Sequence, residues 1–316
     1  MNNTCSTFES EITSLLTQAE KYLREGDVVP AFEILGPALT RMTLVEFAQS
    51  ELPEHARTVA RNHEIFSLVQ EDPYSHRAFH KPRGYAGDAV MLDYVYLGVP
   101  PIDTSEMGKT VFAGTTRGPM GLSVLFRRQL LTAYINQIVA TRPGFKILSV
   151  ASGHCREIEN SLLAETAMTR TGQFIALDQD PHSCDLVTRY YYQYPIEVIN
   201  GSVRSILMGE LSSIGPFDLI YSAGLFDYLD VGTAGRLVDR LAFLLRPQGK
   251  LLIGNFAPSS FGRAFRDLLL DWQLIYRTEE ELVTLFGSSR KSNVRSFLDP
   301  HGNVAYAEWT RPANDC

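Results

Sequence analysis

The residue with the clearest capacity for chemistry in this sequence is an aspartate that directly follows a short apolar segment. Asp178 comes after residues 174–177 and lies 25 residues after Gly153. A carboxylate in this place can accept hydrogen bonds from both hydroxyls of a nucleoside ribose. Aspartate is also favoured at helix N-termini, so Asp178 or the nearby Asp180 could instead be a helix cap. We expect Asp178 and the neighbouring Gln179 to bind a nucleoside cofactor, with capping as the alternative.

A turn of small residues lies upstream of that aspartate. The segment 146–150 is apolar, and Ala151-Ser152-Gly153 follows it. A turn that brings its backbone close to a ligand favours glycine and other small residues, so we expect these three residues to contact the cofactor. The Gly-x-Gly-x-x-Gly pattern of dinucleotide-binding turns is missing, which argues against a dinucleotide dehydrogenase. Cys155 has no paired base in the sequence, so we interpret it as an inert small residue rather than a nucleophile.

Two later turns offer small or polar groups in comparable places. Asn200-Gly201-Ser202 follows an apolar segment, and its backbone or side chains can meet the edge of an adenine ring, although turns favour the same residues for conformational reasons. A second turn follows the apolar segment 217–221 and leads into aromatic residues that can form a flat wall beside a ligand. The residues that we expect at the cofactor in these two turns are Gly201, Ser202, Ser222, Ala223 and Gly224.

The segments that precede these turns predict the elements that position them. Short apolar segments alternate with segments of helical periodicity, which predicts an α/β fold with a mostly parallel sheet covered on both faces. The strands that we expect are 146–150, 174–177, 196–199, 217–221 and 250–256, with a closing antiparallel hairpin of 294–298 and 304–310. Helices are expected over 157–166, 183–192, 233–245 and 278–286. Ligands of such folds bind at the carboxyl ends of the strands, where the candidate residues lie.

The first part of the chain predicts helices. Ser6 and Glu9 have the spacing of a capping box, and apolar residues then recur at intervals of three and four until Gly26. Two more helices are expected over 30–49 and 53–70, each with a proline in its first turn. Three amphipathic helices would form a small helical subdomain.

Residues 71–121 differ from the segments on either side. Glycine, proline and tyrosine are dense here, which predicts a long ordered loop, and such loops in compact proteins are usually functional. We therefore expect residues 1–125 to form a helical lid or cap, and residues 126–316 to form the cofactor-binding domain. The alternative for the helices is simple packing or a homodimer contact.

The second part of the chain resembles the class I S-adenosylmethionine (SAM) dependent methyltransferases from about residue 145 to residue 311. The turn Leu245-Arg246-Pro247-Gln248-Gly249 is similar to the Leu-Arg-Pro-Gly-Gly turn of that superfamily. The resemblance implies a Rossmann-like fold whose first turn wraps the amino-acid part of SAM and whose Asp178 holds the ribose. The chain departs from the pattern in the first turn, where the usual glycines are replaced, and in the first strand, where Ser149 replaces the usual acid.

A narrower resemblance extends over nearly the whole chain. The strings at 80–88, 221–229 and 271–278 are similar to bacterial proteins labelled 3-hydroxy-fatty-acid methyl ester synthases, which carry a helical N-terminal extension. The resemblance implies SAM-dependent methyl transfer to a small-molecule carboxylate or hydroxyl, of the kind found in secondary metabolites and fatty-acid-type signals. Some related enzymes instead cyclise SAM to azetidine-2-carboxylate and methylthioadenosine. A protein that binds SAM without catalysis is a third alternative.

Three residues are candidates for direct action on SAM or its acceptor. A cation and a ring at Arg83 and Tyr85 could select the SAM carboxylate and face its sulfonium through cation–π attraction, or the loop could simply be tied down by an Arg–Asp pair. Tyr228 either lines the substrate pocket or packs. Methyl transfer needs alignment and exclusion of water, and a carboxylate acceptor needs no general base. No single base is evident, which favours such an acceptor; the open candidates are His154, Asp227 and Asp88.

Composition and charge exclude several other classes of protein. The chain is 45% hydrophobic and 21% charged, which is typical of a globular protein. A formal net charge of -7 without a basic cluster argues against a nucleic-acid partner. The sequence has no apolar run long enough to span a membrane and only 4 cysteines, so we expect a cytoplasmic enzyme without disulfides. His76 and His80 have a metal-ligand spacing, but no glutamate follows His76, and we expect no metal site.

Overall fold

The computed structural model describes residues 2–47, 54–167 and 172–313. The chain divides into two compact units. We name them the helical unit (residues 1–124 and 259–273) and the sheet unit (residues 125–258 and 274–316). The segment 259–273, which we expected within the cofactor-binding domain, therefore groups with the N-terminal helices.

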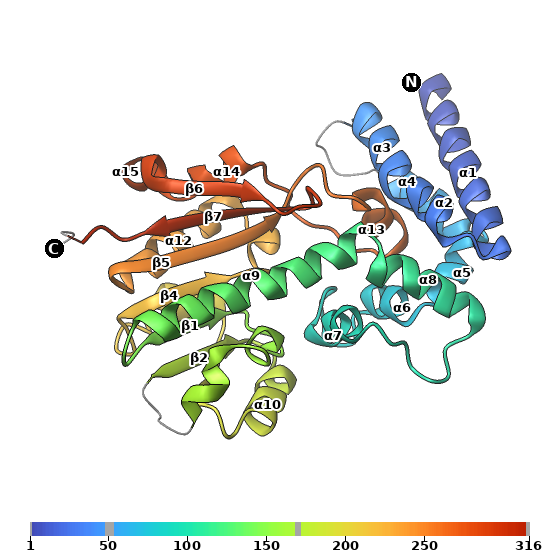
Figure 1. Cartoon of the computed structure of the whole chain (residues 1–316). Helices are drawn as coiled ribbons and strands as arrows, with labels where there is room; N and C mark the ends of the chain where they lie inside the picture. Colours follow the sequence, from blue (N-terminus) through green and yellow to red (C-terminus); the bar gives the residue numbers. More distant parts are fainter. Residues whose placement is uncertain (1, 48–53, 168–171, 314–316) are drawn as a thin grey trace. The chain divides into compact units, whose positions relative to one another are not determined.

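The sheet unit contains a seven-stranded mixed sheet (Figure 1). Its strands are β1 (Lys146–Val150), β2 (Gln173–Asp178), β3 (Ile196–Asn200), β4 (Phe217–Ser222), β5 (Leu245–Phe256), β6 (Val294–Leu298) and β7 (Val304–Thr310). The strand order is β3-β2-β1-β4-β5-β7-β6; the first five strands are parallel, and β7 is antiparallel to both β5 and β6. The predicted α/β class, with a mostly parallel sheet and a terminal antiparallel hairpin, is confirmed.

Both faces of the sheet are buried, which explains why its central strands are continuous apolar runs. Along β2, Phe174 and Ala176 belong to one hydrophobic cluster, whereas Ile175 and Leu177 belong to another. The first cluster also contains residues of α9 (Pro119–Thr141) and α10 (Pro181–Tyr190). The second contains residues of α11 (Val203–Met208), α12 (Val231–Phe243) and α14 (Glu279–Thr284). The sheet is thus the middle layer of three.

Of the helices predicted in this unit, one begins with the expected cap and another is not formed. The capping box of Thr278 and Glu281 forms at the start of α14, as the expected helix over 278–286 requires. The expected helix over 157–166 is wrong: two short 3-10 helices, η2 (Arg156–Ile158) and η3 (Leu162–Ala167), stand there instead. Their separation is stabilised by Asn136, whose Oδ1 accepts a hydrogen bond from the backbone N–H of Leu162 at 2.7 Å. Short elements complete the unit at η4 (Phe226–Tyr228), α15 (Gly287–Arg290) and η5 (Lys291–Asn293).

The helical unit consists mostly of short helices, several of which pack on the long first helix. Its elements are α1 (Asn2–Glu25), α2 (Val28–Glu33), η1 (Ile34–Ala38), α3 (Leu39–Phe47), α4 (Glu54–Asn62), α5 (Ile65–Gln70), α6 (Pro73–His80), α7 (Ala89–Leu97), α8 (Glu106–Arg117), the start of α9, and α13 (Arg263–Leu269). α1 buries the predicted apolar stripe that includes Ile12, Leu16 and Ala19. The capping prediction is wrong, because Ser6 lies inside α1.

Two predicted helices of this unit are interrupted. The helix expected over 30–49 contains a π-helical turn around Pro37, which lacks the backbone N–H that a regular α-helix needs; residues 48–49 lie outside the described residues. The helix expected over 53–70 divides between α4 and α5, where the ring nitrogen Nδ1 of His63 accepts a hydrogen bond from the backbone N–H of Ile65 at 3.2 Å; residue 53 lies outside the described residues.

The long loop expected over 71–121 is wrong, since most of this segment is helical. The side chains of Asp72, Asp88 and Ser105 cap α6, α7 and α8 by accepting hydrogen bonds from backbone N–H groups. Gly98, with φ +64°, ends α7 in the left-handed region that glycine favours. Some of the glycines that suggested a loop therefore mark helix ends, whereas Gly108 and Gly114 lie inside α8. No helix of the part of the chain that the structure describes is both long enough and apolar enough to cross a membrane.

Candidate cofactor site

Asp178 ends β2 with its carboxylate held by the protein backbone. The backbone N–H of Gly153 donates to Oδ2 at 2.7 Å, and that of Asp180 donates to Oδ1 at 2.9 Å. Asp178 is buried, and this burial raises the pKa of its carboxyl group, while the two backbone bonds oppose the rise. A carboxylate oxygen can accept two hydrogen bonds, so each oxygen of Asp178 can accept one more, as a ribose diol requires.

The capping alternative applies to Asp180 rather than to Asp178. The Asp180 carboxylate accepts hydrogen bonds from the backbone N–H of His182 at 3.0 Å and from the hydroxyl of Ser183 at 2.7 Å, at the start of α10. The neighbouring Gln179 is exposed. Asp178 and Asp180 thus have separate tasks, although they are only two residues apart.

The turn after β1 is folded back on the protein. Ala151, Gly153 and Cys155 have φ values of +55°, +54° and +52°. The backbone N–H of Ser152 donates to the carbonyl of Leu177 at 3.1 Å, and that of Cys155 donates to the carbonyl of Ser152 at 3.1 Å. Together with the bond from Gly153 to the β2 carboxylate, three backbone donors of this turn are engaged inside the protein. These donors are therefore not directed at the amino-acid part of a cofactor.

The turn after β3 is joined to the end of β2. The backbone N–H of Gly201 donates to the carbonyl of Asp178 at 2.9 Å, and the side-chain amide of Asn200 donates to the carbonyls of Asp178 and Gln179 at 3.0 and 3.1 Å. Ser202 stands at the N-cap position of α11 without a capping bond from its side chain. The structure thus places Gly201 and Ser202 beside the Asp178 segment, as a site at this edge requires.

The turn after β4 lies where the strand order reverses between β1 and β4, which is the usual ligand position in open α/β sheets. Ser222 is buried, and its hydroxyl donates to the carbonyl of Val150 at 3.0 Å, so its side chain joins β4 to β1. The carbonyl of Ala223 accepts a hydrogen bond from Nη1 of Arg127 at 2.9 Å. Gly224 is exposed.

Arg127 is a candidate that our sequence analysis missed. It lies on α9, and its guanidinium reaches the end of β4 from 96 residues earlier in the chain. No motif surrounds it, because its place at the sheet edge arises from helix packing. A cation is thereby positioned at the same sheet edge as the Asp178 carboxylate.

A buried acid–phenol pair lies next to this edge and was also missed. The hydroxyl of Tyr221 donates to Oε1 of Glu157 at 2.5 Å, and burial raises the pKa of both groups. Cys155, which precedes Glu157 by two residues, is buried as well, and its burial raises the pKa of its thiol well above the ordinary value. A thiol that stays protonated is a poor nucleophile, which agrees with the inert interpretation of Cys155.

Two of the candidate general bases have structural partners. Asp227 is buried, and its Oδ1 accepts a hydrogen bond from the backbone N–H of Phe256 at 2.6 Å. Asp88 caps α7 and pairs with Arg77 at 2.6 Å. Both contacts favour a structural role for these acids over proton transfer. His154, the third candidate, is 4% exposed.

The candidates for direct action on SAM lie in different units. Tyr228 ends η4 in the sheet unit and is 41% exposed. Arg83 and Tyr85 belong to the helical unit, in the partly exposed 81–88 loop between α6 and α7. Gly84, with φ +86°, lets this loop turn sharply between them. The catalytic assignment of these three residues stays a prediction.

The two histidines with metal-ligand spacing stack on each other. The ring centroids of His76 and His80 are 3.9 Å apart on α6, and Nδ1 of His80 lies 2.9 Å from the carbonyl oxygen of His76. Among residues 2–47, 54–167 and 172–313, no group of three His, Cys, Asp or Glu side chains could hold a metal ion.

Comparisons with known proteins define the fold. No family model and no curated protein matches the sequence. A possible exported protein from Bordetella parapertussis is 17% identical, with a TM-score of 0.63 over 82% of this chain and 94% of that chain. A putative methyltransferase from Thermobifida fusca is 14% identical, with a TM-score of 0.50 over 70% of this chain and 94% of that chain. With its strand order and these likenesses, the chain has the Rossmann-like α/β fold of class I SAM-dependent methyltransferases, together with a helical N-terminal region.

Proposed function

We propose that this protein is an enzyme that binds SAM and transfers its methyl group to a small-molecule carboxylate or hydroxyl. The observation that carries the proposal is the buried Asp178 carboxylate at the carboxyl end of β2, oriented by the backbone N–H groups of Gly153 in the first turn and of Asp180. Its two remaining acceptor positions suit the 2′ and 3′ hydroxyls of a ribose. When bound, SAM supplies an electrophilic methyl group on a sulfonium that is already a good leaving group.

The other residues of the sheet edge have roles that follow from their places. Gly201, Ser202 and Gln179 flank the ribose acid and suit contacts with the adenine. Ala223, whose carbonyl bonds Arg127, and the exposed Gly224 follow β4 at the strand-order reversal, where a ligand of this fold binds. In this proposal the chain contributes mainly alignment of the acceptor and exclusion of water.

Arg127 suits the carboxylate of the methionine part of SAM. The first turn uses three of its backbone N–H groups internally, so a side-chain cation is needed for that carboxylate. The guanidinium of Arg127 stands at the end of β4 and can bind a carboxylate in the fork geometry typical of arginine. Arg127→Met should therefore weaken the binding of SAM while leaving methylthioadenosine, which lacks the amino-acid part, bound as in the unmodified protein.

The acceptor in this proposal is a carboxylate or hydroxyl on a fatty-acid-type molecule. The resemblance of the 80–88, 221–229 and 271–278 strings to 3-hydroxy-fatty-acid methyl ester synthases supports that choice. The structural partners of Asp88 and Asp227 support a reaction without a general base, since a carboxylate acceptor is already a nucleophile. The helical unit, with Arg83 and Tyr85, has the role of a lid in this proposal.

Cyclisation of SAM is the second candidate, and the geometry of the first turn favours it. A turn whose donors are engaged internally leaves the aminocarboxypropyl arm free to curl. The neutral α-amine would attack Cγ, the bond between Cγ and sulfur would break, methylthioadenosine would leave, and the amine would lose one proton to solvent.

One experiment separates these functions. The purified full-length protein is incubated with SAM alone, and the products are identified by mass spectrometry. Methylthioadenosine with azetidine-2-carboxylate identifies a cyclase. Unchanged SAM, followed by S-adenosylhomocysteine when hydroxy fatty acids are added, identifies a methyltransferase. Calorimetry that detects no binding of SAM at millimolar concentration would refute both functions.

A further inference from the structure

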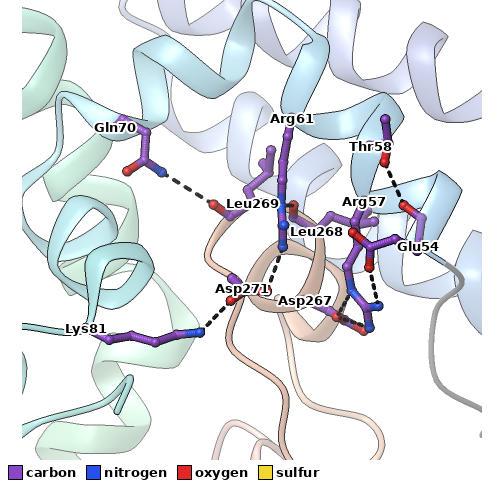
Figure 2. A network of polar contacts seen from close by, with 10 residues as sticks. All are labelled: Glu54, Arg57, Thr58, Arg61, Gln70, Lys81, Asp267, Leu268, Leu269 and Asp271. Carbon is purple, nitrogen blue, oxygen red and sulfur yellow. Dashed lines mark hydrogen bonds and ion pairs between the residues drawn. The ribbon is translucent and has the colours of Figure 1, made fainter. Parts of the chain in front are cut away.

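The segment 259–273 is held within the helical unit by a network of charged and polar groups, which Figure 2 shows from close by. Its helix α13 carries Asp267, whose Oδ1 accepts a hydrogen bond from Nε of Arg57 at 2.9 Å. Arg57 also donates to Glu54 at 3.3 Å. Two backbone carbonyls of the segment are also bonded. The carbonyl of Leu268 accepts a hydrogen bond from Nε of Arg61 at 3.3 Å, and the carbonyl of Leu269 accepts one from the side-chain amide of Gln70 at 3.4 Å. The helix is thus fixed to α4 and α5.

Asp271, just after α13, joins two cations from different elements. Its Oδ1 accepts a hydrogen bond from Nη2 of Arg61 at 2.8 Å, and its Oδ2 accepts one from Nζ of Lys81 at 2.5 Å (Figure 2). Arg61 belongs to α4, whereas Lys81 follows α6. We name these three residues the Asp271 latch. The latch therefore connects the 259–273 segment to the start of the 81–88 loop.

Lys81 and Asp271, which bond each other in the latch, both have unusual backbone conformations. Lys81 has φ +48° and Asp271 has φ +49°, in the left-handed region that disfavours residues with a side chain. Each conformation is supported by a backbone bond: the N–H of Lys81 donates to the carbonyl of Arg77 at 3.0 Å, and the N–H of Trp272 donates to that of Arg266 at 3.0 Å. Backbones of this kind persist where their surroundings hold them.

The far end of the 81–88 loop has a matching anchor. Asp88 is 1% exposed, caps α7 by accepting a hydrogen bond from the backbone N–H of Met91 at 3.0 Å, and pairs with Arg77 at 2.6 Å. The loop is thus held at one end by Lys81 with Asp271 and at the other by Asp88 with Arg77. These two contacts therefore fix the two ends of the loop.

We propose that Asp271 is a positioning residue, which holds Lys81 and thereby sets the orientation of Arg83 and Tyr85 in the 81–88 loop. Its part in turnover rests on the proposed function, in which Arg83 and Tyr85 act on SAM. Its effect on the loop itself is independent of any ligand.

The test replaces Asp271 by asparagine, which keeps nearly the same shape, tolerates left-handed backbone and removes the charge. The matched control is Asp267→Asn, on the same segment, because Asp267 pairs with Arg57 of α4 rather than with the loop. Two readouts follow the loop: amide hydrogen exchange of peptides covering 81–88, and the rate of trypsin cleavage after Arg83. Binding of SAM by calorimetry and turnover of SAM are measured on the same proteins.

Asp271→Asn should raise both loop readouts by about threefold, the change expected when a partly exposed ion pair is lost. It should lower the turnover number more than it weakens SAM binding. Lys81→Gln should reproduce the effect, and the double variant should be no worse than either single one. Asp267→Asn should lower the melting temperature more than Asp271→Asn does, yet leave loop exchange at the rate of the unmodified protein.

Three outcomes would overturn the proposal. Loop exchange could be unchanged in Asp271→Asn, it could rise equally in both variants, or it could rise in Asp271→Asn while turnover stays normal, which would make the latch purely structural. If the unmodified protein neither binds nor consumes SAM, the proposed function fails, while the loop readouts still decide whether Asp271 holds Lys81.

Discussion

The carboxyl edge of the sheet unit and the 259–273 segment of the helical unit use aspartate in opposite ways. At the sheet edge, Asp178 is buried and accepts hydrogen bonds from two backbone N–H groups. In the 259–273 segment, the side chain of Asp271 is 36% exposed and is paired with two cations. Backbone donors are positioned by the fold and leave the carboxylate with its negative charge, whereas side-chain cations neutralise it. The first arrangement suits ligand binding, and the second suits holding a loop.

The largest effect is expected where a charge pair of the 259–273 segment is mostly buried. The side chains of Arg57 and Asp267 are 8% and 18% exposed. Asp267→Ala should lower the free energy of unfolding by roughly 3 kcal/mol, because the Arg57 charge stays mostly buried and keeps the exposed Glu54 as a partner. Glu54→Ala, which removes an exposed partner of the same arginine, should lower it by less than about 1 kcal/mol. Urea unfolding of both variants checks this, and equal losses would contradict it.

Asp72 tests whether the properties of an aspartate depend on the groups that it bonds or on the unit in which it lies. It lies in the helical unit but, like Asp178, is buried among neutral donors: the backbone N–H of Tyr74, and Ser75 and Thr115. Burial raises its pKa from 3.8 to about 6. Between these values the folded state holds a proton that the unfolded state releases, so this contribution to stability is complete below pH 3.8 and is lost as the pH rises through 6.

From pH 4 to pH 7, the unmodified protein should therefore lose roughly 2.4 kcal/mol of stability relative to Asp72→Asn. Urea unfolding of both proteins across this range measures the difference. Parallel pH curves would show that the Asp72 carboxyl group has the same proton affinity in the folded and unfolded protein.

Removing the sheet-edge acid should affect binding more than folding. Asp178→Ala removes charged hydrogen bonds worth roughly 1.5–3 kcal/mol each, so the affinity for SAM should fall between about tenfold and a few hundredfold. Calorimetry on the folded variant measures this. Unchanged affinity would show that Asp178 serves only to hold the turn through Gly153.

The smallest expected effect is that of salt, which should act on the ion-paired Asp271 and not on the backbone-bonded Asp178. Ions screen the partly exposed pairs of Asp271, and such pairs contribute roughly 0.2–1 kcal/mol. Raising salt from 0.05 to about 0.5 M should increase hydrogen exchange of the 81–88 loop about twofold and leave exchange at Gly153 unchanged. A similar increase at both places would mean that the Asp271 latch is no more electrostatic than the backbone bonds of Asp178.

The positions of the central strands along the chain and the cap of α14 could be predicted from the sequence because their causes are local. β1, β2 and β4 are buried on both faces, so each is a continuous apolar run bounded by a turn. Thr278 and Glu281 are three residues apart and bond each other's backbone directly. The positions of Asp178 and Gly153 at one sheet edge follow from parallel pairing of β1 with β2.

Other features depended on contacts that no local pattern encodes. The glycines and capping residues of 71–121 are compatible with loops and with short helices, and the packing of α8 against α2, α5 and α6 favours the helices. Arg127 meets Ala223 across 96 residues, and Lys81 meets Asp271 across 190. No sequence pattern near either side chain identifies its partner, because a hydrogen bond between distant residues needs only a donor and an acceptor that the fold brings within reach. The sequence by itself determined the sheet and the place of its candidate ribose acid, whereas the tertiary structure alone decided which cation stands at the sheet edge and which acid holds the 81–88 loop.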